Sequence, residues 1–217
     1  MDPEGVDGPP TDDAGRRQGH HRAARTEEVL IEFGTDVRLR PLEAHDGEAL
    51  AAAFARNRAH LAPWDPERDE SFFSEREQRR LIVALLADRD AGRSDPFVLI
   101  RADDDAIVGR VNLSNIVRGA FHSADLGYWI DSALAGHGLM TRAVAAVVEH
   151  AASALELHRL QASTLLHNAA SQRVLAANGF ERIGMAPAYL RIAGEWQDHY
   201  LFQRILTRDG LVRPAAV

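Results

Sequence analysis

The spacing of apolar residues changes between two periods along the chain, and this change predicts an alternation of strands and helices. Residues 37–42 alternate apolar with polar side chains, as a half-buried strand does. Over residues 49–54 the apolar side chains recur at intervals that place them on one face of a helix. We therefore predict a first strand over residues 37–42. A first helix follows, which has Asp46 as its N-cap and ends near His60.

The remaining chain continues this alternation. Ser74 and Glu77 form a capping-box pattern before a helical stripe that ends near Gly92. Three strands, a long helix, a strand and a helix that stops at Asn178-Gly179 follow, and two more strands close the chain. The six elements before the closing strands are expected at 97–100, 107–113, 122–130, 139–154, 159–165 and 169–177. The predicted order, β-α-α-β-β-β-α-β-α-β-β, describes an α+β fold around an antiparallel meander.

Composition sets the limits of the folded domain. The chain has 217 residues, 46% of them hydrophobic, which suffices for one substantial core. Residues 1–28 carry almost no large apolar side chain and are predicted to be a disordered tail. We place the domain at 29–208 and a C-terminal tail at 209–217. The sequence has no apolar run of membrane-spanning length and no export signal after Met1, so we expect a cytoplasmic protein without a membrane partner.

Charge and residue usage exclude several kinds of chemistry. The net charge of -7 argues against a nucleic-acid partner. All 25 basic residues counted as Lys or Arg are Arg, which removes lysine Schiff bases and P-loop lysines. The absence of Cys removes disulfides and thiolate nucleophiles. His20-His21 has no partner at ligand spacing, so no metal is predicted.

The most informative segment is a glycine-rich turn, residues 135–141, between a strand and the long helix. Glycine lets the backbone approach a ligand, and the first N–H groups of a helix lack intrahelical partners. Together with the helix dipole they favour a pyrophosphate. A Rossmann motif would need a third glycine where Thr141 stands. The alternative is that Gly136 and Gly138 only shape the turn.

The run from Gly136 to Ala143 is similar to the G-x-G-Y-A/M-T-E-A form of the RimJ/RimL-like branch of the GNAT N-acyltransferases. Ala135 stands where that branch frequently has Gln. Further matches follow in the family's order: Leu61-Ala62-Pro63-Trp64-Asp65-Pro66, Leu126-Gly127-Tyr128-Trp129-Ile130, Leu157-His158-Arg159-Leu160, Asn168-Ala169-Ala170-Ser171 and Leu175-Ala176-Ala177-Asn178-Gly179-Phe180. The resemblance spans Val37 to Leu206. It implies the GNAT fold, a central, mostly antiparallel twisted sheet of about seven strands flanked by about four helices.

The resemblance also implies a co-substrate, acetyl-CoA or another short acyl-CoA. Its pyrophosphate would lie on the glycine-rich turn, and its pantetheine arm between two splayed strands. The implied contacts are Tyr128, Trp129, Ile130, Ala135, Gly136, His137, Gly138, Leu139, Met140, Thr141, Asn168 and Ser171. The rings of Tyr128 and Trp129 are expected to pack in the core, with only their backbone facing the ligand.

Catalytic roles follow from the same resemblance. Ser171 would protonate the departing thiolate or stabilise the sulfur, and Asp125 would bind or deprotonate the amine. Asn168 is also expected to be the N-cap of the helix that contains Ser171 at its third position. Trp64 and Asp65 would contact the acceptor amine. The alternatives are structural: a solvent-facing Asp125, and a loop-capping Asp65.

The implied activity is transfer of an acetyl or other short acyl group to a primary amine, either a protein N-terminus or a small amine. A homodimer is common for such folds. Two alternatives stay open: a succinyl-CoA-dependent transferase, and a CoA-binding module without turnover, because no general base stands clearly in the sequence. Residues with side chains that could contact CoA or substrate are Arg118, Arg159, Arg173, His122 and His199.

Overall fold

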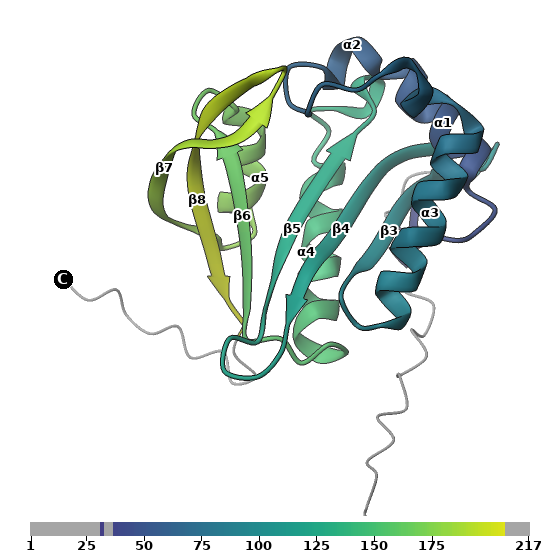
Figure 1. Cartoon of the computed structure of the whole chain (residues 1–217). Coiled ribbons are helices and arrows are strands. Elements are labelled where there is room, and N and C mark those ends of the chain that lie inside the picture. Colours follow the sequence, from purple (N-terminus) through teal and green to yellow (C-terminus); the bar gives the residue numbers. More distant parts are fainter. Residues whose placement is uncertain (1–30, 33–36, 207–217) are drawn as a thin grey trace, which may run out of the picture.

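One sheet runs through the whole fold (Figure 1). The computed structural model describes residues 31–32 and 37–206, so the predicted tails 1–28 and 209–217 lie outside the described residues. Among the described strands the order is β1-β2-β3-β4-β5-β6-β8-β7, and only β5 and β6 run parallel. The strands are β1 (Ile31–Glu32), β2 (Val37–Pro41), β3 (Asp95–Arg101), β4 (Ile107–Val117), β5 (Ser123–Ile130), β6 (Arg159–Leu165), β7 (Glu181–Ile192) and β8 (Glu195–Ile205).

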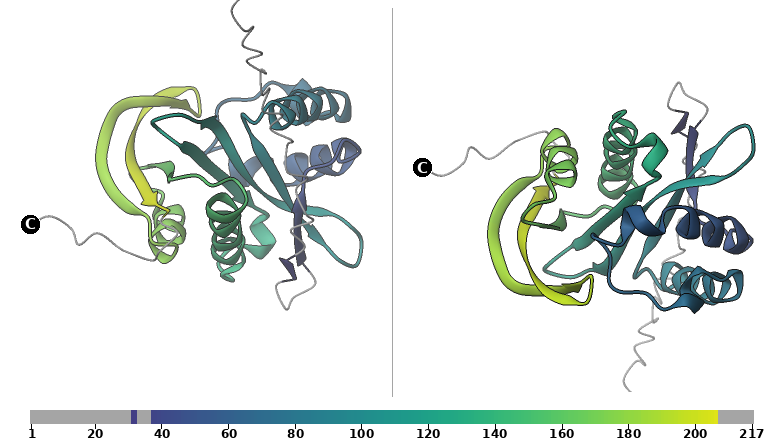
Figure 2. Two further views of the ribbon diagram at one scale, coloured as in Figure 1. Left: turned by 90° about the horizontal axis from the view of Figure 1, so that it is seen from below. Right: turned by 90° about the horizontal axis from the view of Figure 1, so that it is seen from above.

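Helices cover both faces of the sheet (Figure 2). The α-helices are α1 (Gly47–Arg56), α2 (Arg58–Leu61), α3 (Glu75–Asp90), α4 (Leu139–Ser153) and α5 (Ala169–Ala177). Two short 3-10 helices are η1 (Glu70–Phe73) and η2 (Ser132–Leu134). The observed order therefore confirms the predicted alternation and adds the two-residue β1, the short α2 and the 3-10 turns. Among the described residues, no helix has the length and apolarity needed to span a bilayer.

The two faces of the sheet belong to two separate cores. On β3, Phe97 and Leu99 pack in the core beneath α4, whereas Val98 and Ile100 pack in the core beneath α1 and α3. Successive side chains of a strand point to opposite faces, so a strand covered on both sides needs a continuous apolar run. The sequence of β3 has such a run, and all four of these side chains are buried.

The first predicted helix is broken near its C-terminal end. Its residues form α1 and the short α2, which are separated by Asn57. The Asn57 amide donates to the Ala53 carbonyl at 3.0 Å and to the Asp131 carboxylate at 3.1 Å. This side chain satisfies a terminal carbonyl of α1 and is held by a residue of another element, so the helix ends there. The prediction of a single helix to His60 is wrong in this detail.

Two predicted N-caps differ in what their side chains do. Asp46 precedes α1, but its carboxylate accepts from Arg40 at 2.6 and 2.8 Å and makes no cap to the helix. Ser74 caps α3, because its hydroxyl oxygen accepts from the Glu77 N–H at 3.3 Å. The Glu77 carboxylate instead binds Arg80 at 2.6 and 2.9 Å. The capping box is therefore half formed.

Candidate functional site: a cleft between two splayed strands

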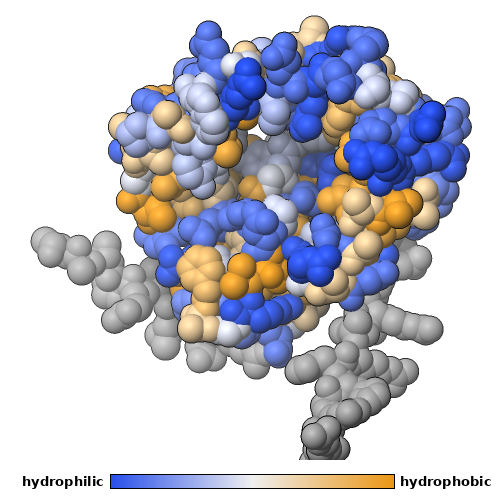
Figure 3. Space-filling view, viewed as in Figure 1, coloured by the Kyte–Doolittle hydropathy of each residue, from blue (hydrophilic) through white to orange (hydrophobic). Residues whose placement is uncertain are grey.

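A cleft opens where β5 and β6 separate. The two strands pair only over Ser123–Asp125 and Arg159–Gln161. Beyond that point they diverge, and Leu126–Ile130 of β5 faces Ala162–Leu165 of β6 across a cleft of about 670 Å³. Figure 1 shows the two strands meeting at one end and spreading at the other, and Figure 3 shows a hollow at the centre of the same face. A long, narrow ligand fits this geometry.

The predicted glycine-rich turn forms one end of the cleft. Gly136 and Gly138 both have positive φ angles, 83° and 74°, and a Cβ at either position would meet no atom within 4 Å. The glycines are therefore required by backbone conformation, and the space beside them is open to a ligand. Gly138 is the N-cap of α4, with no side-chain cap and no acidic residue in the first turn. The first N–H groups of α4 are thus available to an anion.

The Ser171 hydroxyl lies in the cleft and has a partner that the sequence did not reveal. Its oxygen is 2.8 Å from the Tyr128 hydroxyl, which also donates to the Ser171 carbonyl at 3.2 Å. Burial raises the pKa of Tyr128 to about 12, although the contact with Ser171 opposes this rise. Tyr128 therefore stays protonated near neutral pH and can donate its one proton to the carbonyl or to the hydroxyl oxygen of Ser171.

The position of Ser171 is fixed by the start of α5. Asn168 is the N-cap of α5, and its side-chain oxygen accepts from the Ser171 N–H at 3.0 Å. This confirms the predicted cap. Both residues line the cleft, as Arg173 and His199 do. The helix start thus holds one hydroxyl beside the splayed strands.

The two predicted acceptor-site residues, Trp64 and Asp65, also line the cleft. The ring of Trp64 packs against His167, with 5.4 Å between the ring centroids. Burial raises the pKa of the Asp65 carboxyl, while the nearby Arg68 and Arg110 lower it. Within the described part of the chain, this carboxylate makes no hydrogen bond or ion pair. Asp65 lines the cleft, so its carboxylate is available to a ligand there.

Comparison with known proteins connects this geometry to a family. The model of the acetyltransferase (GNAT) domain matches residues 36–181. A ribosomal protein uS5-alanine N-acetyltransferase from Escherichia coli (strain K12) is 38% identical over 159 residues, which are 72% of this chain and 82% of that protein. The chain belongs to the GNAT acetyltransferase family.

Two solved structures of family members agree with the fold. The ribosomal-protein-S5-alanine acetyltransferase from Vibrio fischeri superposes with a TM-score of 0.80 at 36% identity, covering 83% of this chain and 98% of that one. RimJ from Mycobacterium smegmatis, in complex with CoA-disulfide, superposes with a TM-score of 0.75 at 32% identity, covering 82% and 84%. The expected RimJ/RimL-like branch is confirmed. The GNAT chain described here is an acyl-CoA-dependent N-acyltransferase, and its co-substrate is a CoA thioester.

Most of the residues predicted to contact CoA in this GNAT fold lie together. Apart from His137, they all line the cleft: Tyr128, Trp129, Ile130, Ala135, Gly136, Gly138, Leu139, Met140, Thr141, Asn168 and Ser171. The Trp129 ring packs on Phe54 at 5.2 Å, as expected of a core aromatic. His137 is exposed on the turn and does not line the cleft.

Other predicted residues of this GNAT chain are not brought to Ser171. Asp125 does not line the cleft, and its carboxylate accepts from the Asn115 amide at 2.8 Å. Three further predicted contacts are engaged elsewhere: Arg118 donates to the Leu155 carbonyl, the His122 ring contacts the Gly119 carbonyl, and the guanidinium of Arg159 lies near the ring of Phe121. The structure thus separates the Asp125 carboxylate from the cleft that holds Ser171.

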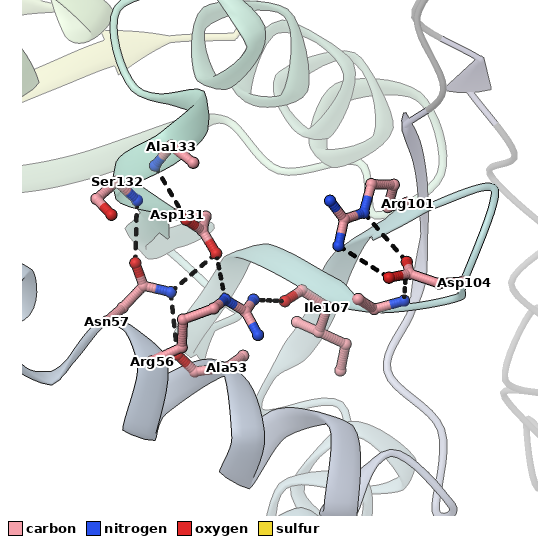
Figure 4. Close-up of polar contacts among 10 residues, drawn as sticks. Ala53, Arg56, Asn57, Arg101, Asp104, Ile107, Asp131, Ser132 and Ala133 are labelled. Carbon is pink, nitrogen blue, oxygen red and sulfur yellow. Dashed lines mark hydrogen bonds and ion pairs between the residues drawn. The ribbon is translucent and has the colours of Figure 1, made fainter.

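A partly buried network, which the sequence reasoning missed, holds the segment that leads into the glycine-rich turn (Figure 4). The Asp131 carboxylate accepts from Arg56 at 2.7 Å, from Asn57 at 3.1 Å and from the Ala133 N–H at 3.0 Å. Burial raises the pKa of Asp131, but these three donors together hold it below its usual value. The end of α1 is thereby tied to the turn that precedes Gly136. The sequence signals for this network are only Arg56-Asn57 near the end of a predicted helix and Asp131 directly after a predicted strand.

We expect Asp131→Asn to destabilise the protein by about 1–3 kcal/mol, because the substitution keeps the shape but removes the charge that Arg56 and Asn57 satisfy. Chemical denaturation at pH 7 measures this change. The pKa of Asp131 is lowered in the folded protein. Its stabilising effect is therefore present above the ordinary aspartate pKa and is lost as the pH falls through the lowered value. The difference between the variant and the wild type should narrow in acid.

A matched control is available in the same view. Asp104 pairs with Arg101 at 2.8 Å in an exposed turn (Figure 4). Asp104→Asn should destabilise the protein less than Asp131→Asn, because solvent screens an exposed pair. Equal effects of the two substitutions would contradict the role given to the buried carboxylate of Asp131.

Proposed function

We propose that this enzyme transfers an acetyl group from acetyl-CoA to the N-terminal α-amine of a ribosomal protein. The observation that carries the proposal is the position of the Ser171 hydroxyl. It lies in the cleft between the splayed strands, and the same cleft is lined by the start of α4, which has no side-chain cap. The names of the similar proteins, which are uS5-alanine acetyltransferases, support the acceptor. Such an acceptor would place the enzyme in the cytoplasm.

The donor would lie along the cleft in an extended conformation. The N–H groups at the start of α4 would bind the pyrophosphate, and Arg173 stands on the same cleft for a phosphate contact. The pantetheine arm would follow the exposed backbone of β5 from Tyr128 to Ile130, where β6 no longer pairs. A backbone N–H of this strand would polarise the thioester carbonyl.

The chemistry is a direct transfer in a ternary complex. The neutral amine attacks the thioester carbonyl carbon, a C–N bond forms, and the C–S bond breaks. The departing thiolate takes a proton from the Ser171 hydroxyl, which can accept a hydrogen bond from Tyr128. The proton that the attacking nitrogen loses as it becomes an amide restores the serine hydroxyl. Because the phenol has a pKa of about 12, it supplies this bond throughout the neutral range.

Asp65 would receive the acceptor amine. Asp65 lines the cleft and its carboxylate has no hydrogen-bonding partner among the described residues, so an N-terminal ammonium group would supply one. The raised pKa brings the carboxylate closer to the range in which it can accept a proton from the ammonium group. This assigns amine binding and deprotonation to Asp65, since Asp125 does not line the cleft.

Asp65→Asn should lower kcat/KM for a peptide acceptor about 10- to 100-fold, because the ammonium group loses a charge-assisted hydrogen bond. Steady-state kinetics at saturating acetyl-CoA measures it. The advantage of the wild type should shrink as the pH falls through the raised pKa of Asp65, since the protonated carboxyl no longer attracts the amine. Asp103→Asn, in the β3–β4 turn, is the control and should leave kcat/KM unchanged.

An acceptor comparison tests the proposed function. Acetyl-CoA is offered with a peptide that begins with a free alanine amine, with the same peptide blocked at its N-terminus but carrying a lysine, and with a small polyamine. We expect acetylation of the first alone, detected as a mass gain on the N-terminal residue. Preferred acetylation of the lysine or the polyamine would overturn the assigned acceptor.

Light scattering of the purified protein tests the predicted homodimer.

A further inference from the structure

A second cavity, of about 350 Å³, adjoins the catalytic cleft. Its walls are the side chains of Phe54, Leu61, Phe72 and Phe73, with Asp65 and Ala193 at its border, and we call it the side pocket. Leu61 and Asp65 line both the side pocket and the cleft. The two cavities therefore share two lining residues, and one of them is the aspartate to which we assign the acceptor amine.

Three aromatic side chains form one part of the wall of the side pocket. Phe54 packs on Phe72 with 4.9 Å between the ring centroids, and Phe72 contacts Phe73 edge to face at 5.4 Å. Phe54 also contacts Trp129, which lines the cleft. Protein interiors are close-packed, so an aromatic cavity of this size beside an active site suits a ligand group.

The segment that supplies two of these rings is fixed by side-chain hydrogen bonds. The buried Gln78 amide donates to the Phe72 carbonyl at 2.6 Å. The Asp69 carboxylate accepts from the Phe72 N–H at 3.2 Å, and the Ser74 hydroxyl donates to the Ser71 carbonyl at 2.6 Å. The other border is also tied, since the Ala193 N–H donates to the Asp65 carbonyl at 3.0 Å. The pocket is therefore held in shape without a ligand.

The charged residues that line the side pocket do not favour a charged ligand group. Arg58 lies over the Phe73 ring at 4.4 Å and pairs with Glu70 at 2.8 Å, and Arg68 lies over the Phe72 ring at 4.5 Å. Glu70 lies outside the pocket, and among the lining residues Glu67 and Asp65 add two carboxylates to the two guanidinium groups. Because the signs balance around apolar walls, a neutral hydrophobic group is the best match.

We propose that the side pocket binds a large apolar side chain of the acceptor polypeptide, close to its acetylated N-terminus. This inference rests on the proposed function, because it places the α-amine at Asp65. An extended chain rises about 3.3 Å per residue, so only the side chains nearest the amine reach a cavity that shares Asp65 with the cleft. The enzyme would thus read the start of the acceptor sequence as well as its free amine.

Peptide acceptors that carry one phenylalanine in a serine-rich background test this inference. The phenylalanine is placed at position two, three or four after an N-terminal alanine, and an all-serine peptide is the reference. One placement should raise kcat/KM about 10- to 100-fold, the gain expected for filling an apolar pocket. Equal kcat/KM values for all peptides in the wild-type enzyme would overturn the assignment of the side pocket, whatever the result with any variant.

Filling the pocket from its rim gives an independent test. Ala62 is exposed and lines the side pocket, so Ala62→Phe introduces a ring there without disturbing the core. This variant should lose the gain from the favoured phenylalanine. The control Ala84→Phe, on an exposed position of α3, should keep it. If the gain persists in Ala62→Phe, the pocket assignment is wrong. If acetyl-CoA binds but no peptide is acetylated, the proposed function itself fails and the inference falls with it.

Discussion

Replacing Gly138 with aspartate is expected to weaken acetyl-CoA binding about 100-fold or more. The residue is the N-cap of α4 with a φ angle of 74°, so the substitution adds backbone strain as well as a carboxylate. That carboxylate would lie where the first N–H groups of α4 meet the pyrophosphate, and two like charges at one anion site repel. Isothermal titration calorimetry with acetyl-CoA measures the change in Kd.

Two matched variants separate charge from strain. Gly138→Ala keeps the unfavourable φ angle without the charge and should weaken binding about tenfold or less. Gly119→Asp adds the same carboxylate at a φ angle of 69°, in the β4–β5 turn at the other end of β5, and should leave the Kd unchanged. Unaltered affinity in Gly138→Asp would contradict the assignment of the pyrophosphate to the start of α4.

The second large effect is expected on chemistry and not on binding. Ser171→Ala should lower the single-turnover rate of acetyl transfer about 100-fold, because the departing thiolate loses its proton donor. The Kd for acetyl-CoA should stay within about threefold of the wild-type value, because Asn168 still caps α5 and the glycine-rich turn is unchanged. Ser153→Ala, which removes an exposed hydroxyl on α4, serves as the control and should change neither quantity.

Tyr128 makes this prediction sharper. Tyr128→Phe should lower the transfer rate about tenfold, since Ser171 keeps its own proton but loses the hydrogen bond at 2.8 Å. In the double variant the two losses should not add, because both act on one proton. Strict additivity, or a wild-type rate in Ser171→Ala, would contradict the assigned donor.

The glycine-rich turn could be read from the sequence because its information is local. A strand end, two glycines and a helix start follow one another within residues 135–141, and each has its own backbone requirement. The cap formed by Asn168 is equally local, since its partner is only three residues away. The same holds for the alternation of strands and helices, which depends on the apolar period.

What the sequence did not predict depends on contacts between distant segments. The Tyr128 hydroxyl meets Ser171 across 43 positions, and Asn57 meets Asp131 across 74. A tyrosine in an apolar strand has no local signal that its hydroxyl faces a cleft and not the core. Asp125 shows the opposite error. Its place in a family motif predicted a role in the site, but its carboxylate binds Asn115 on the neighbouring strand β4.

Thermal unfolding with different donors tests the central claim, that the cleft between β5 and β6 binds an acyl-CoA. The protein is heated alone and with saturating acetyl-CoA, succinyl-CoA or NAD, since a ligand bound only by the folded state raises the midpoint. At a concentration of about 100 times the Kd, acetyl-CoA should add roughly 2.7 kcal/mol and raise Tm by about 5–10 °C, whereas NAD should not shift it. No shift with either thioester, or an equal shift with NAD, would contradict the account.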